Sequence, residues 1–194
     1  MRVPICPGVH AVQPNFFEIL GIEPRLVIDG GTLRDAFLVA GRSAHPDAGG
    51  GEQTFAALNA AFEILSSPSR RLRHWLELRG LTVETRGTVS PEIMDLFSQV
   101  GETSQRAEAL VRRRDDAKSA LGRALLERET QSCREDVERS LALVEAAIDR
   151  ECAIFPACQN SAIIDLAAAS ASVRNLAFLE KWRAGLRGVF ARLV

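Results

Sequence analysis

Apolar residues recur along most of this chain at intervals of three and four, the spacing that places side chains on one face of an α-helix. Segments in which apolar and polar residues alternate, as they do in half-buried strands, are scarce. The pattern therefore predicts an all-α protein. Its 194 residues leave room for one large domain or two small ones.

The first part of the chain predicts four helices. Asn15 is a good N-cap for a short first helix, and Gly21 is a good stop. Thr32 and Asp35 have the spacing of a capping box, which predicts that a second helix begins at Thr32. Pro46 disfavours helical geometry at the residue before it, so this helix is expected to end at Ala44. We expect the four helices over residues 15–20, 32–44, 52–66 and 67–80.

The second part predicts three long helices after a polar linker over residues 81–89. The first should begin at Ser90 and reach about Glu129, with Gly101 as a point of interruption. The second opens with a capping box at Ser132 and Glu135 and is closed by Pro156. The third covers residues 161–194. Three amphipathic helices joined by short turns are expected to pack as an antiparallel bundle over residues 90–194.

Composition narrows the functional classes. The formal net charge is −1, so nothing global points to nucleic acid or to an anionic membrane as a partner. No apolar run is long enough to cross a bilayer, and the tail over residues 1–14 lacks the apolar core of a signal peptide. We therefore expect a cytoplasmic protein.

Candidate chemistry is sparse. The cysteines lack C-x-x-C spacing, which argues against a zinc site and favours buried free thiols. The sequence has no phosphate-binding glycine motif and no nucleophile paired with a base, so we expect neither an enzyme nor a cofactor. The four cysteines are Cys6, Cys133, Cys152 and Cys158.

Several motifs of the first part resemble the J domain of DnaJ-type proteins. A tripeptide, His45-Pro46-Asp47, stands between two helices that are expected to be antiparallel. It is preceded by Phe16-Phe17-Glu18-Ile19-Leu20-Gly21 and followed by Asn59-Ala60-Ala61-Phe62-Glu63-Ile64-Leu65 and Pro68. The resemblance implies a four-helix J domain over residues 15–80.

Within the J-domain class the chain most resembles the HscB family, also called Jac-type co-chaperones. Residues 21–29 are similar to the loop that this family has between its first two helices, and a three-helix bundle follows the J domain there too. Near the end, Leu176-Ala177-Phe178-Leu179-Glu180-Lys181 resembles the last-helix motif of the family.

The resemblance implies a co-chaperone that stimulates ATP hydrolysis by a DnaK-type, HscA-like chaperone. In that reading Pro46 helps to pre-order the loop, and the carboxylate of Asp47 can accept a bidentate bond from an arginine of the chaperone. The residues implied in chaperone binding are His45, Pro46, Asp47, Arg34 and Arg42.

The C-terminal bundle is implied to bind a client, the iron–sulfur cluster scaffold protein. Apolar residues that resemble scaffold-binding positions are Met94, Phe97 and Phe178, although an apolar residue on a helical stripe is more often core, and we favour core slightly. Trp75 and Trp182 are expected to be core anchors.

Two departures from the J-domain pattern keep other functions open. The expected second helix has Arg34 and Arg42 as its cations, and Ala48 stands where a lysine is usual. The fourth helix is more basic, and we expect its cations to form a solvated face. A J-like module that binds a partner without stimulating an ATPase, and a J-domain protein with another client, are the alternatives. The cations of the fourth helix are Arg70, Arg71, Arg73 and His74.

Overall fold

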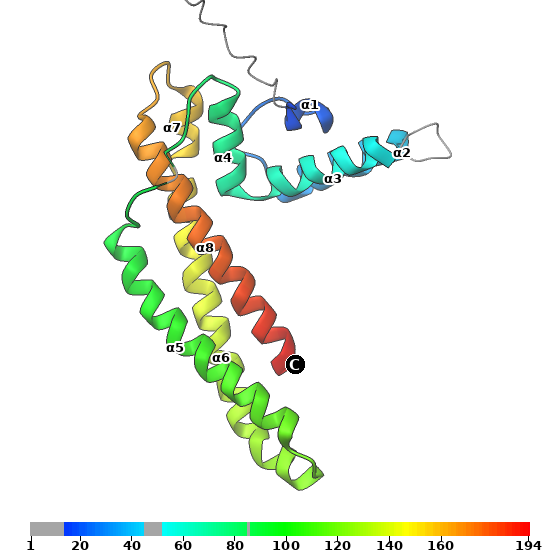
Figure 1. Cartoon of the computed structure of the whole chain (residues 1–194), viewed down its shortest axis with the longest axis vertical. Coiled ribbons are helices and arrows are strands. Elements are labelled where there is room, and N and C mark those ends of the chain that lie inside the picture. Colours follow the sequence, from blue (N-terminus) through cyan, green and yellow to red (C-terminus); the bar gives the residue numbers. More distant parts are fainter. Residues whose placement is uncertain (1–13, 45–51, 85) are drawn as a thin grey trace, which may run out of the picture. The chain divides into compact units, whose positions relative to one another are not determined.

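The computed structural model describes residues 14–44, 52–84 and 86–194, and all regular structure in these ranges is α-helical (Figure 1). The expected all-α class is confirmed. The helices are α1 (Phe16–Ile19), α2 (Gly30–Ala44), α3 (Glu52–Ser66), α4 (Pro68–Glu77), α5 (Pro91–Asp116), α6 (Ala120–Cys152), α7 (Phe155–Asn160) and α8 (Leu166–Leu193).

The chain divides into two compact units. One contains the described residues up to Pro24 together with residues 29–65, and the other contains residues 25–28 and 66–194. Helix α4 therefore groups with the C-terminal helices in this division. The domain limits expected from the sequence, at residues 80 and 90, stay a prediction.

In the first unit, α2 and α3 meet through aromatic rings. The ring centroids of Phe37 and Phe62 lie 4.7 Å apart, and Leu33 and Leu58 are buried. Gly41 also faces α3, because a Cβ added there would lie 3.7 Å from Leu58, an ordinary van der Waals contact. The inward face of α2 is thus occupied by its packing against α3.

Helix α2 begins two residues earlier than expected. Asp29 accepts a hydrogen bond from the backbone N–H of Thr32 at 2.9 Å, and the Thr32 hydroxyl donates to its other carboxylate oxygen. These bonds lower the pKa of Asp29. Asp29 is therefore the capping residue, and the expectation that Thr32 caps the helix was wrong.

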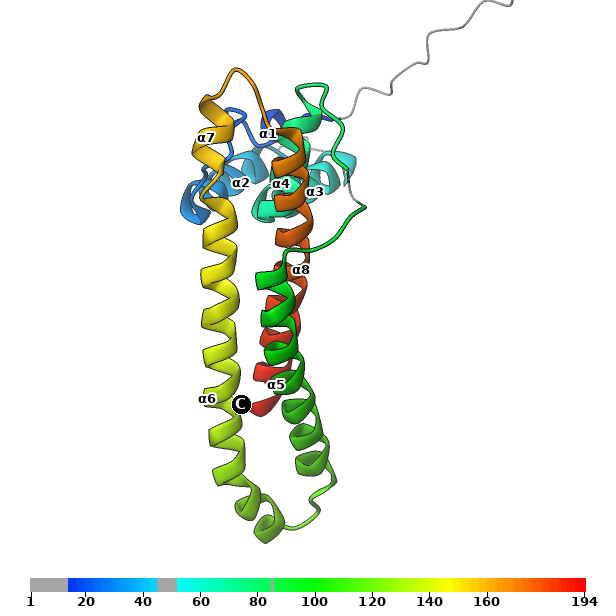
Figure 2. The ribbon, with the colours of Figure 1, turned by 90° about the vertical axis from the view of Figure 1, so that its left-hand side faces the viewer.

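In the second unit, α5, α6 and α8 run side by side as a three-helix bundle (Figures 1 and 2). The turn between the first two helices lies at residues 117–119, and not near residue 130. The hydroxyl of Ser119 accepts a hydrogen bond from the N–H of Gly122 at 3.0 Å, so Ser119 is the N-cap of α6. Ser132 lies inside α6, and α5 continues through Gly101 without a break.

The connection between α6 and α8 also differs from the expectation. Helix α6 ends at Cys152, and Pro156 lies in the first turn of a further helix, α7. Proline fits a first helical turn because its missing N–H would have no partner there. Helix α8 then begins at Leu166, where Asp165 accepts a hydrogen bond from the N–H of Ala168 at 3.0 Å.

The linker over residues 81–89 packs against α8. The N–H of Glu84 donates to the Ser170 hydroxyl at 3.2 Å, and Arg174 donates to the carbonyl oxygen of Glu84 at 2.7 Å. At the end of the linker, the N–H of Ser90 donates to Asn175 at 3.4 Å. Val83 is buried. The described residues of the linker therefore lie against α8, and we call this segment the strap.

Helix α4 packs against α8 with a partly buried polar face. Trp75 is fully buried, which confirms its expected place in the core. Arg71 and His74 are also buried, and burial lowers the pKa of both. The expectation of a solvated basic face on α4 was wrong for these two residues, and Arg71 lies over the ring of Phe155, with 5.9 Å between its guanidinium carbon and the ring centroid.

Candidate functional site

The expected chaperone-binding tripeptide, His45-Pro46-Asp47, lies outside the described residues. The structure does describe the helices on either side of it. Helix α2 ends at Ala44, as expected from the sequence, and α3 begins at Glu52. The roles of the three residues stay a prediction.

The outer face of α2 carries the other expected chaperone contacts. Arg34 and Arg42 are both exposed. Leu38 lies midway between them, four residues from each, so all three share one face of the helix. Leu38 is 52% exposed and its neighbour Val39 is 65% exposed. This face therefore combines separated cations with exposed aliphatic side chains.

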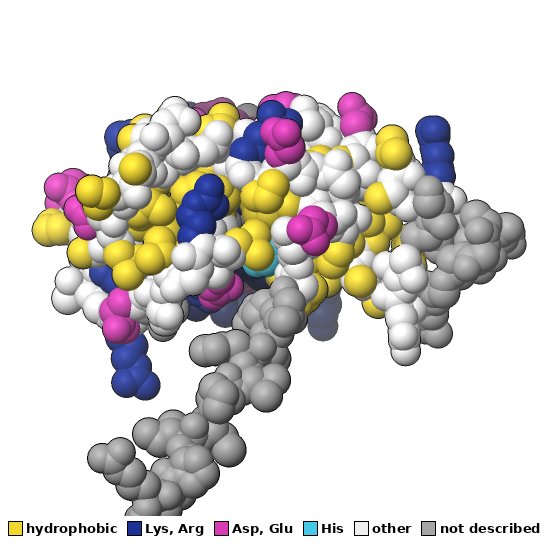
Figure 3. All heavy atoms as spheres, turned by 90° about the horizontal axis from the view of Figure 1, so that it is seen from above, with side chains coloured by type: hydrophobic (Ala, Val, Ile, Leu, Met, Phe, Trp, Pro, Cys, Tyr) yellow, Lys and Arg dark blue, Asp and Glu magenta, His cyan; other side chains and the backbone are white. Residues whose placement is uncertain are grey.

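Separated cations are also seen in the end view of Figure 3, where Lys and Arg side chains stand apart and apolar side chains fill much of the surface between them. A strongly basic strip would draw an acidic partner over long distances. Among the described side chains, the end of the molecule drawn in Figure 3 shows no such strip.

A second candidate site lies where α5 meets α8. The ring of Phe97 on α5 lies 5.4 Å from that of Trp182 on α8, and the ring of Phe178 lies 6.3 Å from the same Trp182. Met94 lies one turn before Phe97 on α5. We call these four residues the aromatic cluster.

The aromatic cluster reaches the surface. Met94, Phe97 and Phe178 are 51%, 49% and 44% exposed, respectively. The interior of the bundle is filled by their neighbours, since Ile93 and Leu179 are buried. The core placement that the sequence slightly favoured for the three residues was wrong, whereas their possible contact with a client remains untested.

Trp182 is the member of the cluster that sequence reasoning missed. It was expected to be a core anchor, but its side chain is half-buried. The sequence did contain a usable signal, because Trp182 follows Phe178 by four residues and must share its helix face. The approach of Phe97 from α5 depends on tertiary packing and could not be inferred from that spacing.

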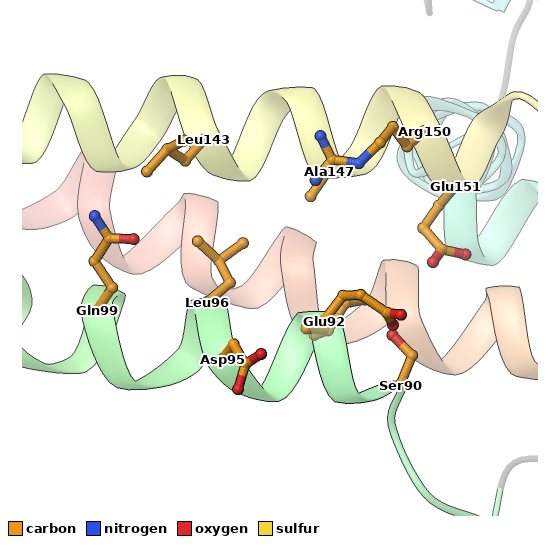
Figure 4. A pocket seen from close by; sticks show the side chains of 10 residues that line it. Ser90, Glu92, Asp95, Leu96, Gln99, Leu143, Ala147, Arg150 and Glu151 are labelled. Atoms are coloured by element: carbon orange, nitrogen blue, oxygen red, sulfur yellow. The ribbon is translucent and has the colours of Figure 1, made fainter.

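A groove of about 450 Å³ lies between α5 and α6 (Figure 4). Its lining includes Leu96 of α5 and Leu143 of α6, together with three carboxylates and one guanidinium. Such a mixture of apolar and charged side chains is more typical of a surface that contacts protein than of a small-molecule pocket. The charged side chains are Glu92, Asp95, Glu151 and Arg150.

The described cysteines are poor candidates for reactive or metal-binding thiols. Cys133 is buried, and Cys152 and Cys158 are half-buried. Burial raises the pKa of all three thiols, that of Cys152 to about 11. No cluster of His, Cys, Asp or Glu that could hold a metal ion occurs in residues 14–44, 52–84 or 86–194.

None of the helices that the structure describes combines the length and the apolar character that crossing a bilayer requires.

The chain is similar in sequence to several proteins that are named as co-chaperones. It is 29% identical over 179 residues to a "Co-chaperone protein HscB homolog" of Cupriavidus taiwanensis, covering 88% of this chain and 90% of that protein. It is 30% identical over 95 residues to the homolog of Shewanella pealeana, covering 44% of this chain and 55% of that protein. No protein-family model matches the chain.

A third relative matches a shorter stretch of the chain. A "Tetratricopeptide repeat and J domain-containing co-chaperone" of Cryptococcus neoformans is 42% identical over 62 residues. The match covers 32% of this chain and 12% of that protein. The chain thus spans a small part of this relative and about half of the Shewanella protein.

The fold is also similar to a solved structure, "Chaperone HscB from Vibrio cholerae". The TM-score is 0.58 at 20% sequence identity, and the match covers 93% of this chain and all of the solved chain. At this identity the likeness concerns the fold. The chain is therefore HscB-like both in sequence and in the arrangement of its helices.

Proposed function

We propose that this chain, an HscB-like J-domain protein, is a co-chaperone that acts on a DnaK-type chaperone. The observation that carries the proposal is the likeness to the HscB homolog of Cupriavidus taiwanensis, which extends over both parts of the chain. In this role the protein breaks no bond itself. It biases a conformational equilibrium of the chaperone and therefore must bind one chaperone state more tightly than another.

The chaperone contact is assigned to the tripeptide His45-Pro46-Asp47 and to the outer face of α2. Arg34 lies near the N-terminal end of this face and Arg42 near its C-terminal end, and both side chains are exposed. Arginine suits such a contact because its planar guanidinium can bind a carboxylate through two parallel hydrogen bonds.

The client contact is assigned to the aromatic cluster. Aromatic side chains and methionine are enriched where proteins bind one another, and a handful of such residues usually carries most of the binding energy. In this chain the cluster has three side chains that are close to half-exposed, which leaves area for a partner to bury. We propose the iron–sulfur cluster scaffold protein as the client, in the cytoplasm.

The test of the co-chaperone role is single-turnover ATP hydrolysis by the DnaK-type chaperones of the same organism. Wild-type protein should accelerate hydrolysis, and the His45→Gln variant should not. A Leu121→Gln variant, altered at an exposed position of α6, serves as the matched control and should behave like wild type. Acceleration that survives His45→Gln would contradict the assignment of the tripeptide.

The second candidate function is a J-like binding module without ATPase stimulation. The observation that favours it is the composition of α2, which carries two arginines and one aspartate along its whole length. In the same assay, this alternative predicts chaperone binding or client binding with no acceleration by wild-type protein.

A further inference from the structure

We propose that α2 binds the chaperone chiefly through an apolar contact made by Leu38 and Val39, with Arg34 and Arg42 fixing the orientation. The inference deepens the proposed function and rests on it, since the chaperone is taken to be the partner. It names the chemistry of the surface that the chaperone must present.

The first support is that Leu38 and Val39 have no role in the interior of their unit. The inward face of α2 is supplied by Leu33 and Phe37, and the ring of Phe37 packs at a tilt against that of Phe62 of α3. Leu33 is 3% exposed, whereas Leu38 and Val39 present more than half of their area to solvent. A partner that covers these two side chains removes apolar area from water without disturbing the core.

The second support is the placement of charge around the pair. Arg34 and Arg42 lie one turn to either side of Leu38, separated by about 12 Å of helix axis. Two arginines and Asp35 give α2 a net charge of +1, from +2 and −1. Such a small charge attracts a partner only weakly over long distances. The two guanidiniums can still orient the partner, because carboxylates on its surface must lie opposite them to form ion pairs.

These observations define a complementary surface. The chaperone should present an apolar recess for Leu38 and Val39, with two carboxylates at its rim about 12 Å apart. A uniformly acidic surface would leave the aliphatic pair against charged groups and would gain little from it. We therefore expect α2 to bind a chaperone that has such an apolar recess more tightly than one whose matching surface is acidic throughout.

The experiment measures the dissociation constant of the full chain for each DnaK-type chaperone of its organism, with ATP, at low and high salt. We compare wild type with a Leu38→Gln, Val39→Gln double variant and with an Arg34→Gln, Arg42→Gln double variant. The matched control is a Leu121→Gln, Leu125→Gln double variant, which alters two leucines of α6 that are even more exposed. Circular dichroism and thermal unfolding verify that each variant is folded.

We expect wild-type affinity to change by less than about threefold between 50 and 500 mM salt, because few charges contribute. The Leu38, Val39 variant should lose roughly tenfold or more in affinity, since two aliphatic side chains no longer become buried. The α6 control should bind like wild type.

Two results would overturn the inference alone. One is steep weakening of wild-type binding with salt while the Leu38, Val39 variant binds normally. The other is self-association of wild type that the same variant abolishes, which would make a second copy of this chain the occupant. If wild type binds no chaperone and accelerates no ATPase, the proposed function fails as well.

Discussion

Glu180 of α8 accepts two hydrogen bonds from Ser69 of α4, one from the backbone N–H at 3.1 Å and one from the hydroxyl at 2.7 Å. The hydroxyl of Ser67, the N-cap of α4, donates to the same carboxylate at 2.7 Å. A carboxylate at a helix N-terminus interacts favourably with the helix dipole and with N–H groups that have no partner inside the helix. Glu180 thus ties the beginning of α4 to the last helix.

We expect Glu180→Gln to lower the free energy of unfolding by about 1–3 kcal/mol, because the charge-assisted hydrogen bonds are weakened. Urea denaturation followed by circular dichroism measures the change. The matched control is Glu145→Gln, which removes an exposed ion pair with Arg187 and should cost less than about 1 kcal/mol. Equal effects of the two substitutions would show that Glu180 acts as an ordinary surface charge.

The aromatic cluster should govern client binding. We expect Phe97→Ala and Phe178→Ala each to weaken binding of the iron–sulfur scaffold protein by about tenfold or more, as truncation of a central interface residue does. Isothermal titration calorimetry at tens of micromolar measures it. Absence of any complex with wild-type protein would contradict the proposed client.

The groove between α5 and α6 supplies the control for the cluster. Leu143 is also a partly exposed apolar residue, but it lines the groove instead of the cluster. Leu143→Ala should leave scaffold binding unchanged. If Leu143→Ala weakens binding and the phenylalanine variants do not, the groove is the client site.

Stability should decrease in mild acid because of His74. Burial lowers its pKa below the ordinary 6.5, so the unfolded chain takes up a proton at a pH where the folded protein does not. This contribution is complete above pH 6.5 and is lost as the pH falls toward the lowered pKa, by at most about 1.4 kcal/mol per pH unit. Denaturation of wild type and of His74→Gln at pH 7.5 and 5.5 should show a smaller loss in the variant. An identical loss would exclude His74 as the cause.

Gly87 in the strap should resist substitution. Its φ of 141° is rare for residues with a side chain, and an added Cβ would lie 3.0 Å from Arg174. We expect Gly87→Ala to destabilise the protein by about 1 kcal/mol or more. Gly101→Ala, inside α5 with nothing near the added Cβ, should stabilise it by about 0.5–1 kcal/mol. Thermal unfolding of the pair separates backbone strain from a general effect of alanine.

Local patterns in the sequence predicted the helices other than α7, and they located the ends of α1 to α4 more accurately than those of α5, α6 and α8. Asn15 is the N-cap of α1, and Ser67 is the N-cap of α4 with Pro68 in the first turn, as their residue types indicated. The turn between α5 and α6 was misplaced because residues 117–119 contain neither glycine nor proline. A Ser-x-x-Glu pattern further along, at Ser132, gave a stronger local signal than the real turn did.

The errors about burial have a different origin. Arg71 and His74 look like surface residues in a basic helix, but both are buried where α4 packs against helices that follow much later in the chain, and Arg71 lies over the ring of Phe155 in α7. Trp182 looks like core, yet it is half-buried because Phe97 and Phe178 flank it at the surface. The burial of Arg71 and His74 and the approach of Phe97 to Trp182 depend on tertiary packing, whereas the shared face of Phe178 and Trp182 follows from their spacing.

The described thiols of this chain are at least half-buried, and burial raises the pKa of each of them. The pKa of Cys152 is raised the furthest, to about 11, so its side chain is held as the thiol at neutral pH. The thiolate is the form that captures iron and that peroxide oxidises to sulfenic acid. Burial therefore disfavours iron binding and oxidation at Cys133, Cys152 and Cys158, which matches the proposal that the client, and not this chain, holds the cluster.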